Sequence, residues 1–191
     1  MEKKNTPLAI ILISIIGICL IGCLGIGLAT RLAPDIYQYS LENSSLKVGD
    51  PAPDFELTSL EGETMRLSQF KGQPVLLTFG ASWCPDCKIE APLLQELHEA
   101  RPELVILLVD SKENPNTVQR FADDFGITHP ILLDQDGKIM ELYQVFAIPT
   151  ELFIDANGII KAKLIEQVTP ELLTEKLLLI DINLLYETET Y

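Results

Sequence analysis

The sequence predicts an α/β fold in which helices flank a mixed central sheet. From residue 48 onward, apolar runs of strand length alternate with segments of helical periodicity. The run 104–109 is apolar throughout, as expected of a strand that is covered on both faces of a parallel sheet. Asn157-Gly158 separates two later apolar runs, and this dipeptide is the strongest short signal for an antiparallel hairpin. We therefore expect parallel and antiparallel pairs in one sheet.

The first half of the predicted fold begins with a hairpin. Strands at 55–58 and 64–67 flank a turn that contains glycine, which favours antiparallel pairing. The apolar run 75–79 is expected to be the first central strand, and 85–100 has the periodicity of a helix. The chain has no internal repeat and no nucleotide-binding glycine loop.

The second half continues the alternation. In chain order we expect a helix at 116–125, a short strand at 131–133 and one or two helical turns at 139–145. The two strands of the Asn-Gly hairpin follow at 150–155 and 159–164. Gly126 suits the end of the first of these helices, because glycine adopts the left-handed conformation at little cost. Thr169 as N-cap and Pro170 at the first helical position predict a last helix.

The segment 8–30 is expected to be a transmembrane helix. It has no charged residue and exceeds the length of about 20 apolar residues that crosses a bilayer. Lys3 and Lys4 precede it, whereas Arg31 is the one basic residue close behind it. The positive-inside rule then keeps residues 1–7 in the cytoplasm and places the following domain on the outer side of the cell membrane.

A lipoprotein signal that ends at residue 22 is the alternative, because the segment 20–23 (Leu-Ile-Gly-Cys) resembles a bacterial lipoprotein cleavage site. Cys23 would then be the lipidated first residue of the mature chain. The apolar residues 24–29 favour the uncleaved helix, since a lipidated cysteine is usually followed by a polar tether. A third alternative is a cleaved and released form. All three place the domain outside the cytoplasmic membrane.

Length and charge limit the remaining possibilities. A chain of 191 residues suggests one domain with an appended segment, and we divide it into the leader, a polar linker at 31–47, a domain at 48–182 and a tail at 183–191. The formal net charge of −14 argues against nucleic acid as a partner, because neutralising phosphates requires clustered Lys and Arg. Nothing in the sequence suggests more than a monomer.

Cys84 and Cys87 stand at the predicted strand-to-helix junction, and their spacing allows a disulfide to close and reopen. Unpaired N–H groups and the positive end of the helix dipole favour a thiolate there. A zinc site needs about four ligands. The domain adds only His98 and His129, which we expect at the surface or in loops. We therefore predict a redox site, with no metal and no cofactor beyond the Cys84–Cys87 disulfide.

Five segments of the domain together resemble the membrane-anchored thiol–disulfide oxidoreductases of the TlpA/ResA type. These are 49–55 (Gly-Asp-Pro-Ala-Pro-Asp-Phe), 67–72 (Leu-Ser-Gln-Phe-Lys-Gly), 83–87 (Trp-Cys-Pro-Asp-Cys), 147–150 (Ala-Ile-Pro-Thr) and 153–158 (Phe-Ile-Asp-Ala-Asn-Gly). The resemblance covers the domain from residue 48 to about 182. It implies a thioredoxin-like fold with an N-terminal hairpin and a central insertion at 116–145.

The resemblance and thiol chemistry together imply three catalytic residues. Cys84 is expected to be the exposed nucleophile that attacks a substrate disulfide, and Cys87, less exposed, to resolve the mixed disulfide. Glu90 matches a glutamate that this family carries three residues after the second cysteine, and we expect it to take or give the resolving proton. An ordinary carboxylate on the helix surface is the alternative for Glu90.

Four further residues are expected to bind substrate. Pro149 resembles the family's cis-proline, which exposes the backbone of Ile148 to an extended substrate, and a trans proline at the start of an edge strand is the alternative. Trp83 is expected to pack over the dithiol and shape the docking surface, with a pure core role as its alternative. Pro85 directly follows Cys84, between the two cysteines, and is expected to contact substrate as well.

Two residues depart from cytosolic thioredoxin. Thr78 replaces the buried acid that thioredoxin carries six residues before its first cysteine, which strengthens the case for Glu90. Asp86 lies between the cysteines, where its negative charge disfavours a Cys84 thiolate. Because a stabilised thiolate makes a dithiol oxidising, Asp86 predicts a reducing couple. Ile148 before the proline also resembles reductive thioredoxins.

The predicted function is reduction of disulfides in exported proteins, and apocytochrome c is the client that the resemblance suggests. Electrons are expected from a dithiol donor embedded in the membrane. One alternative is an oxidase of exported thiols. Another is a thiol peroxidase, although peroxiredoxins need Thr or Ser at the position of Ala81. The last is a copper-binding module on the same fold, whose cysteine spacing and histidine ligand this chain does not match.

Overall fold

The computed structural model describes residues 46–180, which are built around a five-stranded sheet in the order β5-β4-β3-β6-β7. β3 (Val75–Gly80) pairs in parallel with β4 (Val105–Ser111), and β4 pairs in parallel with β5 (Ile131–Asp134). On its other side, β3 pairs antiparallel with β6 (Thr150–Ile154), which pairs antiparallel with β7 (Ile160–Leu164). The mixed sheet that the sequence predicts is confirmed.

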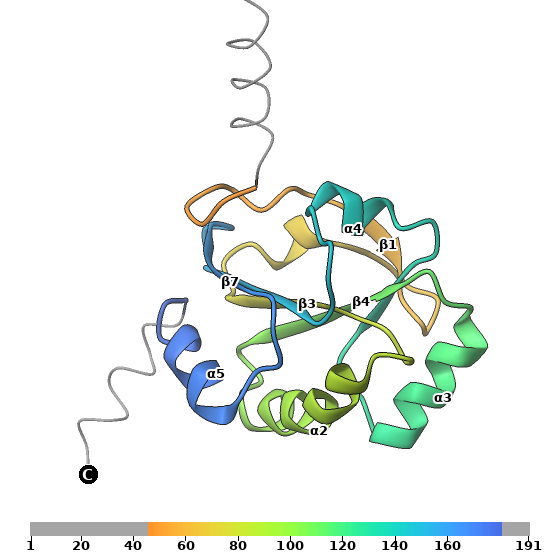
Figure 1. Cartoon of the computed structure of the whole chain (residues 1–191). Coiled ribbons are helices and arrows are strands. Elements are labelled where there is room, and N and C mark those ends of the chain that lie inside the picture. Colours follow the sequence, from red (N-terminus) through yellow and green to blue (C-terminus); the bar gives the residue numbers. More distant parts are fainter. Residues whose placement is uncertain (1–45, 181–191) are drawn as a thin grey trace, which may run out of the picture. The chain divides into compact units, whose positions relative to one another are not determined.

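Helices cover both faces of this sheet (Figure 1). α2 (Pro85–Ala100), α3 (Pro115–Phe125) and α5 (Pro170–Leu177) lie on one face, while the short α4 (Lys138–Leu142) lies on the other. The expected helical segment at 139–145 is therefore helical only as far as Leu142. The three longer helices occur where the sequence predicts them.

β1 (Glu56–Thr58) and β2 (Thr64–Arg66) form the predicted hairpin, which lies on the α4 side of the sheet (Figure 1). It is followed by a 3-10 helix, η1 (Leu67–Phe70), where the sequence predicts no helix. Ser59 forms an isolated antiparallel bridge to Leu132, so that the hairpin is attached to β5.

The core is divided by the alternation of side chains along β3. Leu77 and Phe79 are fully buried on the α4 side, where the Phe79 ring lies 5.5 Å from the ring of Tyr143. Leu76 is fully buried on the opposite side, against α2 and α5. Because strand residues alternate, Thr78 faces the same side as Leu76 and points toward α2. This face of β3 leads to the site described below.

The helix ends follow local sequence signals. The Asn114 side chain accepts the N–H of Thr117 at 3.1 Å at the start of α3, and Thr169 accepts the N–H of Leu172 at 3.3 Å at the start of α5. Gly126 ends α3 in the left-handed conformation, with φ of 64°, as predicted.

No helix within residues 46–180 combines the length and apolar character that a membrane span needs. The predicted anchor at 8–30 and the predicted tail at 183–191 lie outside the described residues.

Candidate active site

Cys84 and Cys87 form a disulfide at the start of α2, with their Cα atoms 5.3 Å apart. Cys84 is the N-cap of this helix and has an extended backbone, and its Sγ accepts the Cys87 N–H at 3.1 Å. Pro85 is the first helical residue. Proline suits this position because a backbone N–H here would have no partner within the helix. The loop that leads to Cys84 follows Gly80, the last residue of β3. The pair therefore lies at the carboxyl end of a central strand, where open α/β sheets place their sites.

The prediction that Cys84 is exposed and Cys87 less exposed is wrong for this disulfide form. Cys84 is 3% exposed and Cys87 is 7% exposed. The disulfide ties the two sulfurs together within the first turn of α2, and Cys84 Sγ turns toward the helix to accept a backbone N–H. Exposure therefore does not distinguish the attacking sulfur from the resolving one.

Apolar side chains stand exposed at the same edge of the sheet. Trp83 is 64% exposed, so a pure core role is wrong for it. The Ile148–Pro149 peptide bond is cis, as predicted. Thr150 pairs with Phe79, which places this cis bond beside the end of β3 that leads to the cysteines. Phe146, which was not among the predicted site residues, is 92% exposed in the loop before the cis bond.

Glu90 is not a surface carboxylate, because it is only 2% exposed. It lies one turn after Cys87 on the inner face of α2, and its Oε1 accepts the N–H of Val168 at 2.5 Å. Burial raises the pKa of Glu90 well above its ordinary value, although the hydrogen bond from Val168 works in the opposite direction. A carboxyl group with a raised pKa beside a thiol is suited to exchange a proton near neutral pH.

Two further carboxyl groups near the cysteines are buried and were not predicted as site residues. Glu151 is fully buried on β6, with Thr78 of β3 as its register partner. Asp110 is 1% exposed near the end of β4, where its register partner is Gly80. Burial is the main cause that raises the pKa of Asp110 to about 8, and the neighbouring Glu113 adds to it. A single acidic residue inside an apolar strand is the sequence signal that marked both.

Glu113 acts on Asp110 and also binds the loop before the disulfide. Its carboxylate accepts the backbone N–H of Ser82 at 2.5 Å and the Ser82 hydroxyl at 2.6 Å. These two hydrogen bonds hold the segment just before Trp83 and Cys84 against the end of β4.

His129 lies in the loop between α3 and β5, in agreement with the expected position at the surface or in a loop, but it is buried there. It is 2% exposed, and its ring lies edge-on to that of His98 with 5.8 Å between centroids. Burial lowers the pKa of His129 to about 4, which keeps the imidazole neutral at neutral pH. With Cys87, Glu90 and Thr78, His129 lines a cavity of about 20 Å³, which is the size of one water molecule. The interior side of Cys87 is therefore mostly apolar, with Thr78, Glu90 and His129 as its polar side chains.

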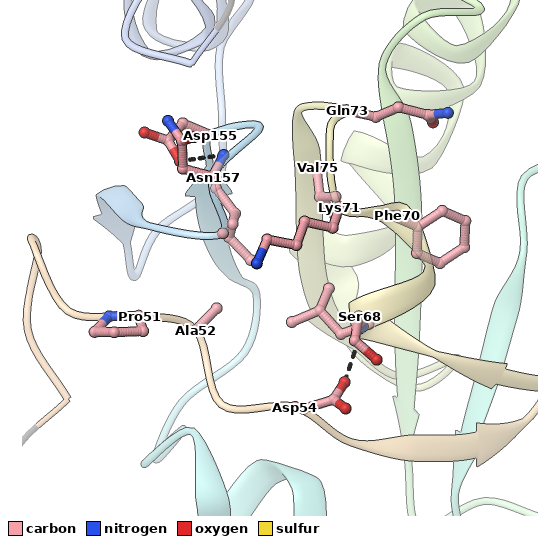
Figure 2. A pocket seen from close by; sticks show the side chains of 13 residues that line it. Pro51, Ala52, Asp54, Ser68, Phe70, Lys71, Gln73, Val75, Asp155 and Asn157 are labelled. Carbon is pink, nitrogen blue, oxygen red and sulfur yellow. Dashed lines mark hydrogen bonds between the residues drawn. The ribbon is translucent and has the colours of Figure 1, made fainter.

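A larger cavity of about 170 Å³ lies at the opposite end of β3, beside Val75 (Figure 2). Two of its charged side chains accept backbone hydrogen bonds, Asp54 from η1 and Asp155 within its own turn. Asp54 accepts the N–H of Ser68 at 2.8 Å, and Asp155 accepts the N–H of Asn157 at 2.9 Å. Because the cysteines follow the other end of this strand, the larger cavity is separate from the redox site. No group of three or more His, Cys, Asp or Glu side chains within residues 46–180 is placed to hold a metal ion.

Comparison with known proteins agrees with this geometry. The model of the AhpC/TSA family matches residues 48–163. The thiol–disulfide oxidoreductase ResA of Geobacillus kaustophilus is 37% identical over 132 residues, which are 68% of this chain and 76% of that protein. ResA of Geobacillus thermodenitrificans is 35% identical over 147 residues, or 75% of this chain and 84% of its own.

Solved structures show the same fold. StoA from Bacillus subtilis is 33% identical, with a TM-score of 0.58 over 67% of this chain and 98% of its own. A secreted disulfide oxidoreductase of Mycobacterium tuberculosis, homologous to DsbE of E. coli, is 25% identical, with a TM-score of 0.61 over 65% of this chain and 94% of its own. The chain belongs to the AhpC/TSA family and is a thioredoxin-fold thiol–disulfide oxidoreductase of the TlpA/ResA type.

Proposed function

We propose that this oxidoreductase reduces disulfides of exported proteins through its Cys84–Cys87 pair. The observation that carries the proposal is the disulfide in the first turn of α2, beside the exposed Trp83 and the loop that ends at Ile148. Exposed apolar side chains around a redox pair suit the docking of an unfolded or extended polypeptide. The ResA relatives, named as thiol–disulfide oxidoreductases, support this assignment.

The reaction is a two-step exchange. The Cys84 thiolate attacks one sulfur of the substrate disulfide, forms a mixed disulfide and displaces the other substrate sulfur as a thiolate. Cys87 then loses its proton and attacks Cys84 Sγ, so that the Cys84–Cys87 bond forms and the reduced substrate leaves. Two electrons pass from the dithiol to the substrate, and a dithiol donor embedded in the membrane restores the dithiol. Glu90 is the group that we assign to the proton of Cys87.

Asp86 supports the reducing direction. It occupies the first turn of α2 between the cysteines, and its side chain is exposed. A negative charge there opposes the ionisation of Cys84, which otherwise benefits from the helix N-terminus. A less stable thiolate makes the dithiol a better electron donor, because oxidising family members owe their high potential to a stabilised reduced form.

The redox potential tests this direction. In dithiol buffers, we expect the redox potential of the Cys84–Cys87 couple to lie close to that of thioredoxin, at about −270 mV. It should lie far from that of DsbA, at about −120 mV. Asp86→Asn should raise the potential by about 10–20 mV, because it removes one exposed charge near Cys84. Glu96→Gln removes an exposed charge three turns along the same helix and should leave the potential unchanged. A wild-type potential near that of DsbA would instead identify an oxidase.

We further propose that the domain works on the outer side of the cell membrane, held by the apolar segment 8–30 and the linker 31–47. The intact mass of the protein purified from its membranes checks this anchor. The expected mass is that of the uncleaved chain. Loss of residues 1–22 together with a diacylglyceryl group on Cys23 would show a lipoprotein anchor instead, and cleavage without lipid would show the released form.

Apocytochrome c is the client that we propose, because its haem-binding thiols have to be reduced before haem is attached.

A thiol peroxidase is the less favoured function of this site. Ala81, three residues before Cys84, has no hydroxyl to offer a peroxide, and its carbonyl is occupied by the N–H of Cys84 at 3.1 Å.

A further inference from the structure

Two buried carboxyl groups meet beneath the redox disulfide. Glu90 comes from α2, and Glu151 comes from β6 at the position opposite Thr78. Glu90 is 2% exposed and Glu151 is completely buried. Thr78 and Glu90 line the same small cavity, and Glu151 lies on the strand next to Thr78, so the two carboxyl groups are neighbours. Because two buried negative charges this close repel each other, one of the two groups has to carry a proton.

The surroundings of the two groups assign this proton to Glu151. Glu90 Oε1 accepts the N–H of Val168, which stabilises the ionised form of Glu90. Within residues 46–180, no N–H or hydroxyl donor reaches either oxygen of Glu151. An ionised Glu151 would thus be an uncompensated charge in the interior, which is costly. Burial raises the pKa of Glu151 far above its ordinary value, and the nearby Glu90 raises it further.

The other groups around Glu90 and Glu151 supply no positive charge that could replace the proton on Glu151. His129 and Cys87 share the small cavity with Glu90, and His129 is neutral at neutral pH because burial lowers its pKa to about 4. The other charge that acts on Glu90 among the described residues is Asp86 on the same helix, and it is also negative. No positive charge competes with the Glu151 proton for the Glu90 carboxylate among these neighbours.

We propose that Glu151 is a positioning residue for proton transfer at Cys87: as a neutral carboxylic acid, it donates a hydrogen bond that keeps Glu90 ionised and ready to accept. This inference rests on the two-step reduction proposed above. In the resolving step, the Cys87 thiol gives its proton to Glu90, and the Cys87 thiolate attacks Cys84 Sγ. As the Cys84–Cys87 bond forms, the bond from Cys84 to the substrate breaks. The substrate sulfur leaves with that electron pair and takes a proton from water.

The position of Glu151 also accounts for Thr78. The antiparallel register places Glu151 opposite Thr78. Thr78 occupies the position where cytosolic thioredoxin carries its buried acid. An interior acid is thus kept beside the resolving cysteine, but it is supplied by β6 instead of β3. Glu151→Gln and Glu151→Leu separate the two properties of this group, because glutamine retains an N–H donor and leucine has none.

The test follows the intramolecular step directly. Reduced protein is mixed with dithiobis(nitrobenzoate), and the second release of thionitrobenzoate, caused by attack of Cys87 on Cys84, is measured from about pH 5 to about pH 9. Losing a hydrogen bond to a charged group should move the midpoint of the pH–rate profile of Glu151→Leu up by about one pH unit. Release at neutral pH should then slow about fivefold. Glu151→Gln should retain the wild-type midpoint.

Each other outcome has a definite meaning. An unchanged midpoint in Glu151→Leu, or an equal displacement in both variants, would overturn the role of Glu151 as a donor. Carboxyl-carbon NMR of the wild type gives the same answer even where the leucine variant does not fold. The Glu151 carbon should stay at its protonated shift through neutral pH while the Glu90 carbon titrates, and an ionised Glu151 would overturn the proposal. A wild-type protein with no second release would refute the proposed reductase mechanism itself.

Discussion

Replacing Cys87 with serine is expected to stop catalysis at the mixed disulfide and to lower turnover to the uncatalysed rate. The serine hydroxyl has nearly the size of the thiol, but it does not attack a disulfide at neutral pH, because the nucleophile in this exchange is a thiolate. Cys84 keeps its place at the N-terminus of α2 and still attacks the substrate. The substrate then remains covalently bound, and it can be identified by non-reducing electrophoresis and mass spectrometry of the full chain expressed in its cells.

Matched variants make this trap specific. Cys84→Ser should trap nothing, because Cys87 is reached only after the first sulfur has reacted, and the double variant should behave in the same way. Multiple turnovers by Cys87→Ser would contradict the dithiol mechanism, and peroxide consumption by this variant would support a peroxidase. Absence of apocytochromes c among the trapped proteins would contradict the proposed client while leaving the reductase mechanism intact.

The oxidised domain is expected to lose stability as the pH rises from about 6.5 to about 8, by about 2 kcal/mol from Asp110 alone. Asp110 is the clearest case, because its folded-state pKa is about 8, against an ordinary value of 3.8. The folded state therefore holds a proton that the unfolded chain has already released. Its stabilising contribution is complete below the unfolded pKa and is lost as the pH rises toward about 8.

The pH window follows from His129, which acts in the opposite direction. Its pKa falls from 6.5 to about 4 on folding, so its contribution is present above pH 6.5 and is lost as the pH falls toward 4. Below about pH 6.5 the histidine and the carboxyl groups partly cancel, and above it the carboxyl groups act alone. Denaturant unfolding at several pH values measures this slope.

Asp110→Asn should flatten this slope by the contribution of one carboxyl group, about 2 kcal/mol between pH 6.5 and pH 8. The variant should consequently be more stable than the wild type at pH 8, because it has no interior charge to form. Glu61→Gln, which changes an exposed carboxyl in the β1–β2 turn, should retain the wild-type slope. Equal slopes in the wild type and Asp110→Asn would show that Asp110 is ionised in the folded state throughout this range.

Local patterns account for the part of the fold that was predicted. The Asn157-Gly158 turn, the Gly126 end of α3 and the Thr169-Pro170 start of α5 depend on residues that are neighbours in the chain, and each was found where expected. The spacing of Cys84 and Cys87 predicted a disulfide for the same reason, since one helical turn determines their separation.

Interior placement was predicted less well, because it depends on what covers a residue. His129 was expected at the surface or in a loop, and the burial of its loop behind Cys87 and next to His98 was not predicted. Cys84 was expected to be exposed and is buried within the disulfide. Glu151 was passed over as one residue of an apolar strand, although its strand places it against α2.

The sequence by itself determined the chemistry of this protein: two cysteines one helical turn apart, at the start of a helix that follows a buried strand. Those features act over a few residues, where backbone geometry and local hydrogen bonds decide the outcome. Only the tertiary structure decided which buried carboxyl groups lie together near the cysteines. The pairing of β6 with β3 and the packing of α2 on that face bring Glu90 and Glu151 together, 61 residues apart in the chain. Whether an acid is ionised depends on burial and on neighbouring charges, and both are set by contacts between distant segments.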